Sequence, residues 1–200
     1  MVRDLSRKLK KKVSLIIKGK TTQVDRDLLE NLKAPINHLL SNAVDHGIES
    51  PEERKKKGKK EEAVISLKAC ISAGELAVEV SDDGRGMNLQ KLRERAIEKQ
   101  LITEDSAKNL GEQELYNLAF YSGVTTEDVV TDVSGRGVGL DVVKSMVEEV
   151  GGRMHIASRK DEGLTCTLYL PLTLSVMNVL VVEIANELYG FPLASIDKII

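Results

Sequence analysis

The chain has 200 residues, of which 42% are hydrophobic and 3% aromatic, and its formal net charge is −2. This length fits one domain of ordinary size plus a remainder, and the hydrophobic content is sufficient for a buried core. The near-neutral charge and the lack of tryptophan argue against a nucleic-acid partner, and nothing in the composition favours an anionic membrane surface.

The first quarter of the chain predicts a strand and a long helical region. Residues 1–12 are basic and helix-prone, and we expect the tail of a helix whose main body is missing. Residues 13–18 show the alternation and β-branching of a strand. A helix should begin at Asp25, and Pro35 should restart or kink it. The restarted helix covers 36–46.

The remaining three quarters predict two hairpins with helices between them. Residues 50–62 are mostly charged, which is typical of a solvated loop. Long polar stretches at 103–111 and 121–134 are usually functional or mobile in a compact domain. The expected elements, in chain order, are strands 63–69 and 76–80, helices 89–98, 112–120 and about 138–150, and strands 154–158 and 165–170.

Strands 63–69 and 76–80 should be joined by a turn around Ala73 and Gly74. Short turns between neighbouring strands favour a mixed, mainly antiparallel sheet. With the helices gathered on one face of that sheet, the fold class is α+β, a two-layer sandwich.

The most informative stretch is 131–143, where Gly135, Gly137 and Gly139 alternate and an amphipathic helix follows. Glycine lets a ligand approach the backbone, and the first helical turn has unpaired N–H groups at the positive end of the helix dipole. These features predict an anion site, most commonly for phosphate. A flexible loop that caps a helix is the alternative. The stretch lacks a P-loop ending and fits a Rossmann turn poorly.

One face of the expected helix 36–46 is polar, because His38, Asn42 and Asp45 lie at i, i+4 and i+7. A zinc site is not favoured, since His38 and His46 are roughly 12 Å apart along a helix axis. The Asn42 carbonyl oxygen suits a hard cation. Mg²⁺ usually takes few protein ligands and completes its shell with phosphate and water, so we predict Asn42 as a ligand of Mg²⁺ with a triphosphate.

A second polar feature is the turn that starts with Asp82 and continues through Gly84, Gly86 and Met87. The glycines give a tight turn with room for a ligand. Asp82 can accept a hydrogen bond from an exocyclic amine such as that of adenine, and Met87 offers a polarisable apolar wall. A plain surface turn is the alternative, since Asp-Gly is common turn chemistry.

Three motifs occur in a fixed order: His-x-x-x-Asn on a helix, Asp-x-Gly-x-Gly after a strand, and Gly-x-Gly-x-Gly before a helix. This order resembles the ATP-binding fold shared by histidine kinases, type II topoisomerases, Hsp90 and MutL. The resemblance narrows to the chemotaxis histidine kinases of the CheA family. It is carried by His38-Leu-Leu-Ser-Asn-Ala-Val-Asp-His-Gly-Ile-Glu49, Pro51-Glu-Glu-Arg54, Asp82-Asp-Gly-Arg-Gly86, Ser134-Gly-Arg-Gly-Val-Gly-Leu-Asp-Val-Val143, Leu170-Pro-Leu-Thr-Leu174, Val179-Leu-Val-Val-Glu-Ile184 and Leu188-Tyr-Gly-Phe-Pro-Leu193.

The resemblance implies roles for matched positions. Asn42 would hold Mg²⁺, Asp82 would bind the adenine amine, and the glycine-rich stretch would wrap the phosphates. His38, where most relatives carry a glutamate, would act with Asn42 in γ-phosphoryl transfer, and residues 103–134 would form a mobile lid. The implied ATP-binding residues are Asn42, Asp45, His46, Asp82, Gly84, Gly86, Met87, Ser134, Gly135, Arg136, Gly137, Val138, Gly139, Leu140 and Thr165.

The resemblance also implies a domain organisation. Residues 1–12 would end a dimerisation helix, 13–171 would form the ATP-binding kinase domain, and 172–200 would be a truncated start of a CheW-like regulatory domain. The tail from about 175 is too short for a β-barrel and strongly apolar. We expect it to be disordered, to pair with another copy or to pack awkwardly.

The implied function is transfer of the γ-phosphoryl group of ATP to a histidine on a separate phosphoacceptor domain. The implied partners are that domain, a response regulator, a CheW-like coupling protein and chemoreceptors, with a homodimer in the full-length protein. Cys70 and Cys166 fit reduced core residues of a cytosolic protein. No stretch resembles a signal peptide or a transmembrane helix, so we expect a cytoplasmic location without direct membrane insertion.

Three positions depart from the family pattern. Ser41 stands where arginine is usual, Leu164 stands where a threonine often supports the adenine site, and 121–124 replaces a Pro-Gly-Phe in the lid.

Two other functions stay open. One is an ATPase and dimerisation module of the topoisomerase, Hsp90 or MutL type, although His38 replaces the glutamate that activates water there. The other is a regulatory module with weakened chemistry.

Overall fold

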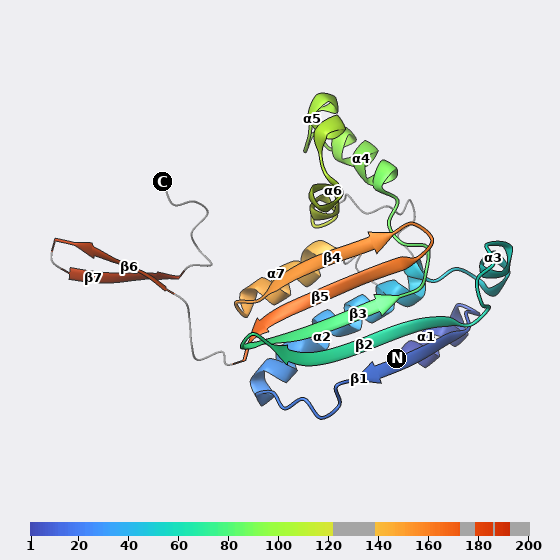
Figure 1. The fold of residues 1–200 in the computed structure, drawn as a ribbon, viewed down its shortest axis with the longest axis horizontal. Helices are drawn as coiled ribbons and strands as arrows, with labels where there is room; N and C mark the ends of the chain where they lie inside the picture. The colour runs from blue at the N-terminus through green and yellow to red at the C-terminus, as the bar shows by residue number, and fades with distance from the viewer. Residues whose placement is uncertain (122–138, 173–178, 186, 193–200) are drawn as a thin grey trace.

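A computed structural model describes residues 1–121, 139–172, 179–185 and 187–192, and Figure 1 shows how their elements are arranged. Five strands form a sheet in the order β1-β2-β3-β5-β4, in which β1 and β2 are parallel and the other neighbours antiparallel. The expected mixed, mainly antiparallel sheet is confirmed. Its strands are β1 (Val13–Lys18), β2 (Ala63–Ser72), β3 (Glu75–Asp82), β4 (Arg153–Arg159) and β5 (Gly163–Pro171).

The hairpin between β2 and β3 has the two-residue turn that the sequence predicts. Ala73 and Gly74 both have positive φ, 51° and 80°, as a tight turn between twisted strands requires. The turn sets a register in which Ser72 pairs with Glu75. Every second residue of β3 then faces the core, and this alternation ends with the buried Asp82.

Helices cover one face of the sheet, so the two-layer α+β sandwich is confirmed (Figure 1). Leu28, Leu32 and Leu39 recur at helical spacing and are at most 3% exposed, in the same core as strand residues such as Leu168. Burying each such leucine contributes about 1.5–3 kcal/mol. The helices of this layer are α1 (Val2–Lys8), α2 (Arg26–Asn42) and α7 (Leu140–Glu149).

Pro35 does not restart α2, so that part of the prediction is wrong. The helix is continuous along its whole length, with Pro35 buried inside it. Proline removes one intrahelical donor, and burial of its ring offsets the loss. The C-terminal end also differs from the prediction. At Asn42 the α-helix passes into a π-helical turn, η1 (Ala43–Gly47), in which the Ile48 N–H donates to the Ala43 carbonyl oxygen at 2.8 Å.

The charged segment 50–62 is not simply a solvated loop, because it begins with the helix α3 (Pro51–Lys56). The Ser50 hydroxyl accepts the Glu53 N–H at 3.3 Å, and the Glu53 carboxylate accepts the Ser50 N–H at 3.0 Å. This capping box, with proline at the first helical position, is a helix-start signal that can be recognised in the sequence. The charge run concealed it, although Arg54 in the middle of the run is only 1% exposed.

Three further helices form a second hydrophobic cluster, which lies beside the edge strand β4 (Figure 1). Met87 and Leu140 contact both this cluster and the main core, so they join the two. One of the helices lies in the polar stretch 103–111 for which no element was predicted. The helices are α4 (Leu89–Glu98), α5 (Glu104–Asn109) and α6 (Glu112–Leu118).

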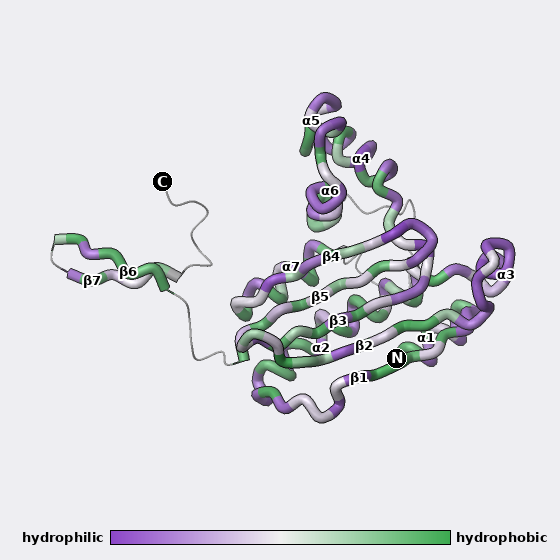
Figure 2. The backbone as a smooth tube through the Cα atoms, viewed as in Figure 1, coloured by the Kyte–Doolittle hydropathy of each residue, from purple (hydrophilic) through white to green (hydrophobic). Residues whose placement is uncertain are grey.

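The strands β6 (Val179–Ile184) and β7 (Glu187–Pro192) form a separate antiparallel hairpin, which lies apart from the main sheet in Figure 1. Its apolar side chains are largely exposed, Leu188 by 74%, and the hairpin is mostly hydrophobic in Figure 2. Its assignment to a regulatory domain stays a prediction. None of the helices in the part of the chain that the structure describes is long and apolar enough to cross a membrane.

Candidate nucleotide site

Asp82, the last residue of β3, is 8% exposed and lies at the centre of the candidate site. Its Oδ1 accepts the Gly84 N–H at 2.9 Å, and the Leu164 backbone also hydrogen-bonds to the carboxylate. Burial raises the pKa of Asp82 to about 6, and these hydrogen bonds limit the rise. The group is therefore mostly ionised at neutral pH. Two carboxylate oxygens offer about four acceptor positions, so capacity remains for a ligand donor.

The glycines of the Asp-x-Gly-x-Gly motif permit close backbone contacts. A Cβ atom on Gly84 would lie 2.1 Å from the carbonyl oxygen of Gly47, at the end of η1. Gly86 has a φ of +65°, and a Cβ atom there would lie 2.2 Å from the Arg159 carbonyl oxygen. Real side chains do not tolerate such distances. Glycine is thus required for the Asp82 turn to fit between η1 and the β4–β5 turn.

The end of α2 and the π-helical turn η1 contain the polar residues that were predicted to bind the metal ion and the phosphates. Asn42 is the last residue of α2, whereas Asp45 and His46 lie in η1. The Asp45 side chain is 7% exposed, and its Oδ2 lies 3.6 Å from Nε2 of His46. A hydrogen bond of 2.9 Å from the Arg85 N–H to the Gly47 carbonyl oxygen attaches this end to the Asp82 turn. The helix motif and the strand motif therefore meet.

The third motif is only partly covered by the structure. Gly139 precedes α7 and Leu140 begins it, and among the described residues no side chain caps this helix start. In Figure 1, α7 runs in the opposite direction to α2, so its first turn faces the end of the sandwich where α2 ends. Ser134, Gly135, Arg136, Gly137 and Val138 lie outside the described residues, as does the predicted lid from 122 onward. The phosphate-wrapping role stays a prediction.

Two other predicted residues have defined surroundings. Thr165 does not join Asp82, because it pairs with Ser81 and its hydroxyl lies 2.9 Å from the Ser81 hydroxyl. Ser81 alternates with Asp82 along β3, so this contact lies on the other face of the sheet. The Met87 N–H donates to the Ser158 hydroxyl at 2.8 Å, and its side chain is half-buried between the two cores.

Sequence reasoning missed two backbone-directed contacts at the site. Leu164, noted only for its side chain, contributes its backbone to the Asp82 carboxylate. Lys11 donates from Nζ to the carbonyl oxygens of Val44, at 2.9 Å, and Asp45, at 2.6 Å. Lys11 thus links the N-terminal segment to η1. A lysine in a basic segment carries no signal for such a contact.

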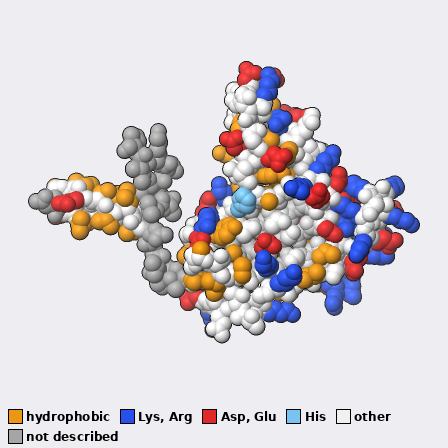
Figure 3. Space-filling view, in the orientation of Figure 1, with side chains coloured by type: hydrophobic (Ala, Val, Ile, Leu, Met, Phe, Trp, Pro, Cys, Tyr) orange, Lys and Arg blue, Asp and Glu red, His pale blue; other side chains and the backbone are white. Residues whose placement is uncertain are grey.

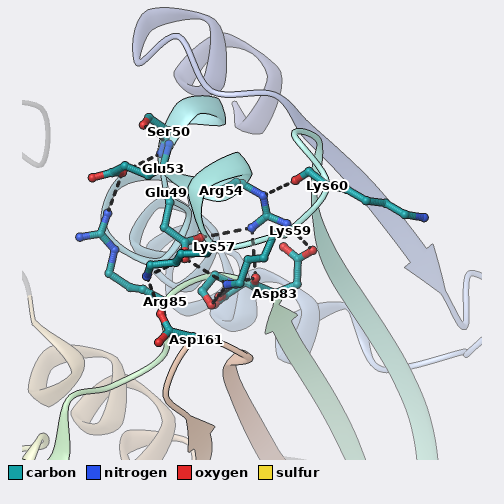
Figure 4. A network of polar contacts seen from close by, with 12 residues as sticks. Glu49, Ser50, Glu53, Arg54, Lys57, Lys59, Lys60, Asp83, Arg85 and Asp161 are labelled. Atoms are coloured by element: carbon teal, nitrogen blue, oxygen red, sulfur yellow. Dashed lines mark hydrogen bonds and ion pairs between the residues drawn. The ribbon is translucent and has the colours of Figure 1, made fainter.

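A buried ion-pair network was also missed (Figure 4). Arg54 on α3 contacts Glu49, which is 2% exposed, and Asp83, the neighbour of Asp82. Lys57 and Lys59 also contact Glu49, at 3.3 and 3.0 Å. Figure 3 shows how closely charged side chains of both signs crowd this end of the molecule. The capping box of α3 was the available sequence signal that this segment is structured.

The chain is similar to known proteins along most of its length. The model of the family "Histidine kinase-, DNA gyrase B-, and HSP90-like ATPase" matches residues 30–174. The chain is 42% identical over 98% of its length to the chemotaxis protein CheA of Bacillus subtilis and equally to that of Rhizobium meliloti, covering 29% and 26% of those proteins. It therefore spans less than a third of these relatives.

A solved structure shows the same fold. The blue-light activated histidine kinase of Erythrobacter litoralis EL346 superposes with a TM-score of 0.51 at 14% identity, over 87% of this chain and 40% of that one. Since the family model covers well over half of the residues, including the Asn42 helix and the Asp82 turn, the chain belongs to the histidine kinase-, DNA gyrase B- and HSP90-like ATPase family.

Proposed function

We propose that the chain is the ATP-binding catalytic domain of a CheA-like protein-histidine kinase. It would transfer the γ-phosphoryl group of ATP to a histidine on a separate phosphoacceptor domain. The observation that carries this proposal is the buried, mostly ionised Asp82 in contact with the end of the Asn42 helix. The 42% identity to CheA proteins along nearly the whole chain supports the kinase class over the other ATPases of the family.

Asp82 recognises the adenine base in this proposal. Its carboxylate is an acceptor without a donor, which complements the exocyclic amine of adenine. Gly84 and Gly86 keep the adjoining backbone free of side chains, and Met87 supplies apolar surface at the junction of the two cores. A carboxylate would repel the carbonyl oxygen that replaces this amine in other purines, so the site selects adenine.

The end of α2 serves the phosphates. Asn42 offers an amide oxygen of the kind that suits a hard cation, and bound Mg²⁺ would neutralise phosphate charge there. The N–H groups at the start of α7, at Gly139 and Leu140, together with the predicted stretch 134–138, would bind phosphate oxygens. His38, half-buried one helical turn before Asn42, would assist transfer. Catalysis of this type depends on positioning and charge stabilisation.

Nothing in this chain resembles a phosphoacceptor domain, so the chain should bind nucleotide without phosphorylating its own histidines. In the longer protein, we propose a homodimer with a response regulator, a CheW-like coupling protein and chemoreceptors as partners, in the cytoplasm. The residues 172–200 would begin the part that contacts the coupling protein.

The test uses the 200-residue chain with γ-labelled ATP, Mg²⁺ and a CheA phosphoacceptor domain supplied in trans. We expect label on the acceptor alone, and Asn42→Ala should abolish it. His38→Ala should lower the transfer rate at least about tenfold with ATP affinity changed less than about twofold. His155→Ala, at an exposed position of β4, is the matched control. Label on the histidines of the chain, or phosphate release that needs no acceptor, would contradict the proposal.

A further inference from the structure

We infer that Arg54, through Asp83, is a positioning residue that orients the Asp82 carboxylate toward the adenine amine. Arg54 lies on α3, outside the three motifs that form the nucleotide site. The inference rests on the proposed base-binding role of Asp82 and adds a residue on which base selectivity depends.

Arg54 is held rigidly by its own contacts. Its guanidinium donates from Nε to the Lys60 carbonyl oxygen at 2.7 Å, from Nη1 to Glu49 Oε2 at 3.2 Å and to the Asp83 carbonyl oxygen at 3.1 Å, and from Nη2 to Asp83 Oδ2 at 2.8 Å (Figure 4). Arg54 and Glu49 are 1% and 2% exposed. The guanidinium presents five N–H donors in one rigid plane, so it holds these acceptors in fixed directions, whereas an ammonium group on a flexible stem has three donors without a fixed plane.

One peptide unit transmits this rigidity to Asp82. The carbonyl group of Asp83 and the N–H group of Gly84 belong to the same planar peptide. The carbonyl oxygen accepts from Arg54 at 3.1 Å and from Lys59 Nζ at 2.9 Å, while the N–H donates to Asp82 Oδ1 at 2.9 Å. Rotation of this peptide away from Arg54 would therefore break the hydrogen bond that orients the Asp82 carboxylate.

The side chain of Asp83 is fixed as well. Its Oδ2 accepts from Arg54, and its Oδ1 accepts the Val64 N–H of β2 at 3.0 Å. Lys59 also donates to the Gly84 carbonyl oxygen at 2.6 Å. The residues that follow Asp82 are thus held by α3, by the segment after it and by the sheet, and a displacement of Arg54 is passed to the carboxylate through the Asp83–Gly84 peptide.

Stability alone does not explain a charged group at this buried position. The loss of solvation free energy on burial of an ion pair is large, so apolar residues of similar volume are often at least as stabilising. Moreover, α3 has other attachments, since Lys57 pairs with Asp161 in the β4–β5 turn and Arg85 lies 3.8 Å from Glu53. What apolar residues could not supply is the set of donors that orients the Asp83–Gly84 peptide.

The experiment measures base selectivity, which loss of stability alone would not change. Calorimetric titration of the 200-residue chain with ATP and with ITP, each with Mg²⁺, gives an ATP-over-ITP preference. The two nucleotides have the same phosphates and ribose, but ITP carries a carbonyl oxygen in place of the amine. The variants are Arg54→Lys and, in case that buried change prevents folding, Asp83→Asn, which keeps an acceptor for Val64. The matched control is Arg153→Lys, whose partner Glu75 begins β3 at the far end from Asp82.

We expect the ATP-over-ITP preference to fall about fivefold or more in Arg54→Lys and Asp83→Asn, mainly through weaker ATP binding, and to be unchanged in Arg153→Lys. The direction in which Asp83→Asn changes the ATP-over-ITP preference is also informative. Removal of a neighbouring negative charge by itself favours ionised Asp82, so a raised preference would indicate a charge effect and overturn positioning.

Two further outcomes are distinguishable. Preserved selectivity in Arg54→Lys and Asp83→Asn, combined with a loss in Asp82→Asn, would overturn the role of Arg54 and leave the proposed base site intact. Unchanged selectivity in Asp82→Asn itself would overturn the base site and the role of Arg54 with it.

Discussion

A Cβ atom placed on Gly47 would lie 3.3 Å from the carboxyl carbon and from both oxygens of Asp82. The end of the helix that carries Asn42 therefore touches the carboxylate that ends β3. Because this contact brings Asp82, the proposed base-recognising group, to the helical segment of Asn42, the proposed metal ligand, it links two motifs of the candidate site. The same contact makes the site sensitive to small changes in packing.

Gly84→Ala should strongly destabilise the fold. The new methyl group would start 2.1 Å from the Gly47 carbonyl oxygen, a backbone atom that can move only if η1 moves. Overpacking of this kind typically lowers the free energy of unfolding by about 1–3 kcal/mol. Urea denaturation provides the measurement. Gly111→Ala is the control, since its Cβ would lie 3.6 Å from Glu114 Oε2, an ordinary contact, and similar losses in both variants would contradict the packing argument.

Asp82→Asn should weaken ATP binding and at the same time stabilise the nucleotide-free domain. The amide loses a charged acceptor for the adenine amine, so affinity should fall about tenfold or more. The substitution also removes a buried charge, and the hydrogen bonds to that charge offset its desolvation cost only in part. Calorimetry and thermal unfolding of the same samples test both effects. Asp105→Asn, on the exposed helix α5, should change neither, and a destabilised Asp82→Asn would show that the charge is well compensated in the fold.

The stability effect of Asp82 should depend on pH with a defined sign. Burial raises its pKa from 3.8 to about 6, so the folded chain holds the proton more tightly than the unfolded chain. The stability contributed by proton binding to Asp82 is complete below pH 3.8 and is lost as the pH rises through about 6. The stability advantage of Asp82→Asn should therefore grow between pH 4 and 6 to a plateau of up to roughly 3 kcal/mol. Denaturation of both proteins across this range would show a constant gap if the pKa were ordinary.

Protonation of Asp82 stabilises the folded chain, but it should weaken the preference for ATP over ITP. Below pH 6, protonation of Asp82 removes the charged acceptor, so the preference for ATP over ITP should decline. The ratio of the two affinities cancels the titration of the phosphates, which both nucleotides share. A preference that persists at pH 5 would argue that another group recognises the amine.

The two cysteines should differ in reactivity. Cys166 is 2% exposed, and burial raises the pKa of its thiol to about 12, so the reactive thiolate is scarce. Cys70 is only half-buried on β2. Brief treatment of the native chain with iodoacetamide should modify Cys70 and spare Cys166, as measured by mass spectrometry of peptides. Unfolding in urea should expose both equally, and rapid native modification of Cys166 would indicate that the sheet opens.

The predictions that succeeded depended on local patterns. The positive-φ turn at Ala73-Gly74 follows from turn chemistry, and α4 begins and ends where the pattern 89–98 predicted. Turn chemistry placed Asp82 where a strand ends, and in the structure it is the last residue of β3. Such features depend on residues a few positions apart, so the sequence alone is sufficient for them.

The predictions that failed depended on distant partners. The continuity of α2 through Pro35 requires a core that receives its ring, and the burial of Arg54 requires Asp83 and Glu49 to meet it. The register of β5, which pairs Thr165 with Ser81, also depends on distant segments, and the ATP-binding role of Thr165 stays a prediction. A local sequence pattern determines neither the register of paired strands nor the ion pairs between distant residues.

By itself, the sequence therefore determined most of the elements and their order, the sandwich class and the chemical groups of two site motifs, because hydrophobic period and turn chemistry act over short distances. Only the tertiary structure decided that Gly47 meets Asp82, that Arg54 reaches the adjoining peptide and that Asp82 is desolvated enough to raise its pKa. Those properties arise when segments far apart in the chain exclude water from one another.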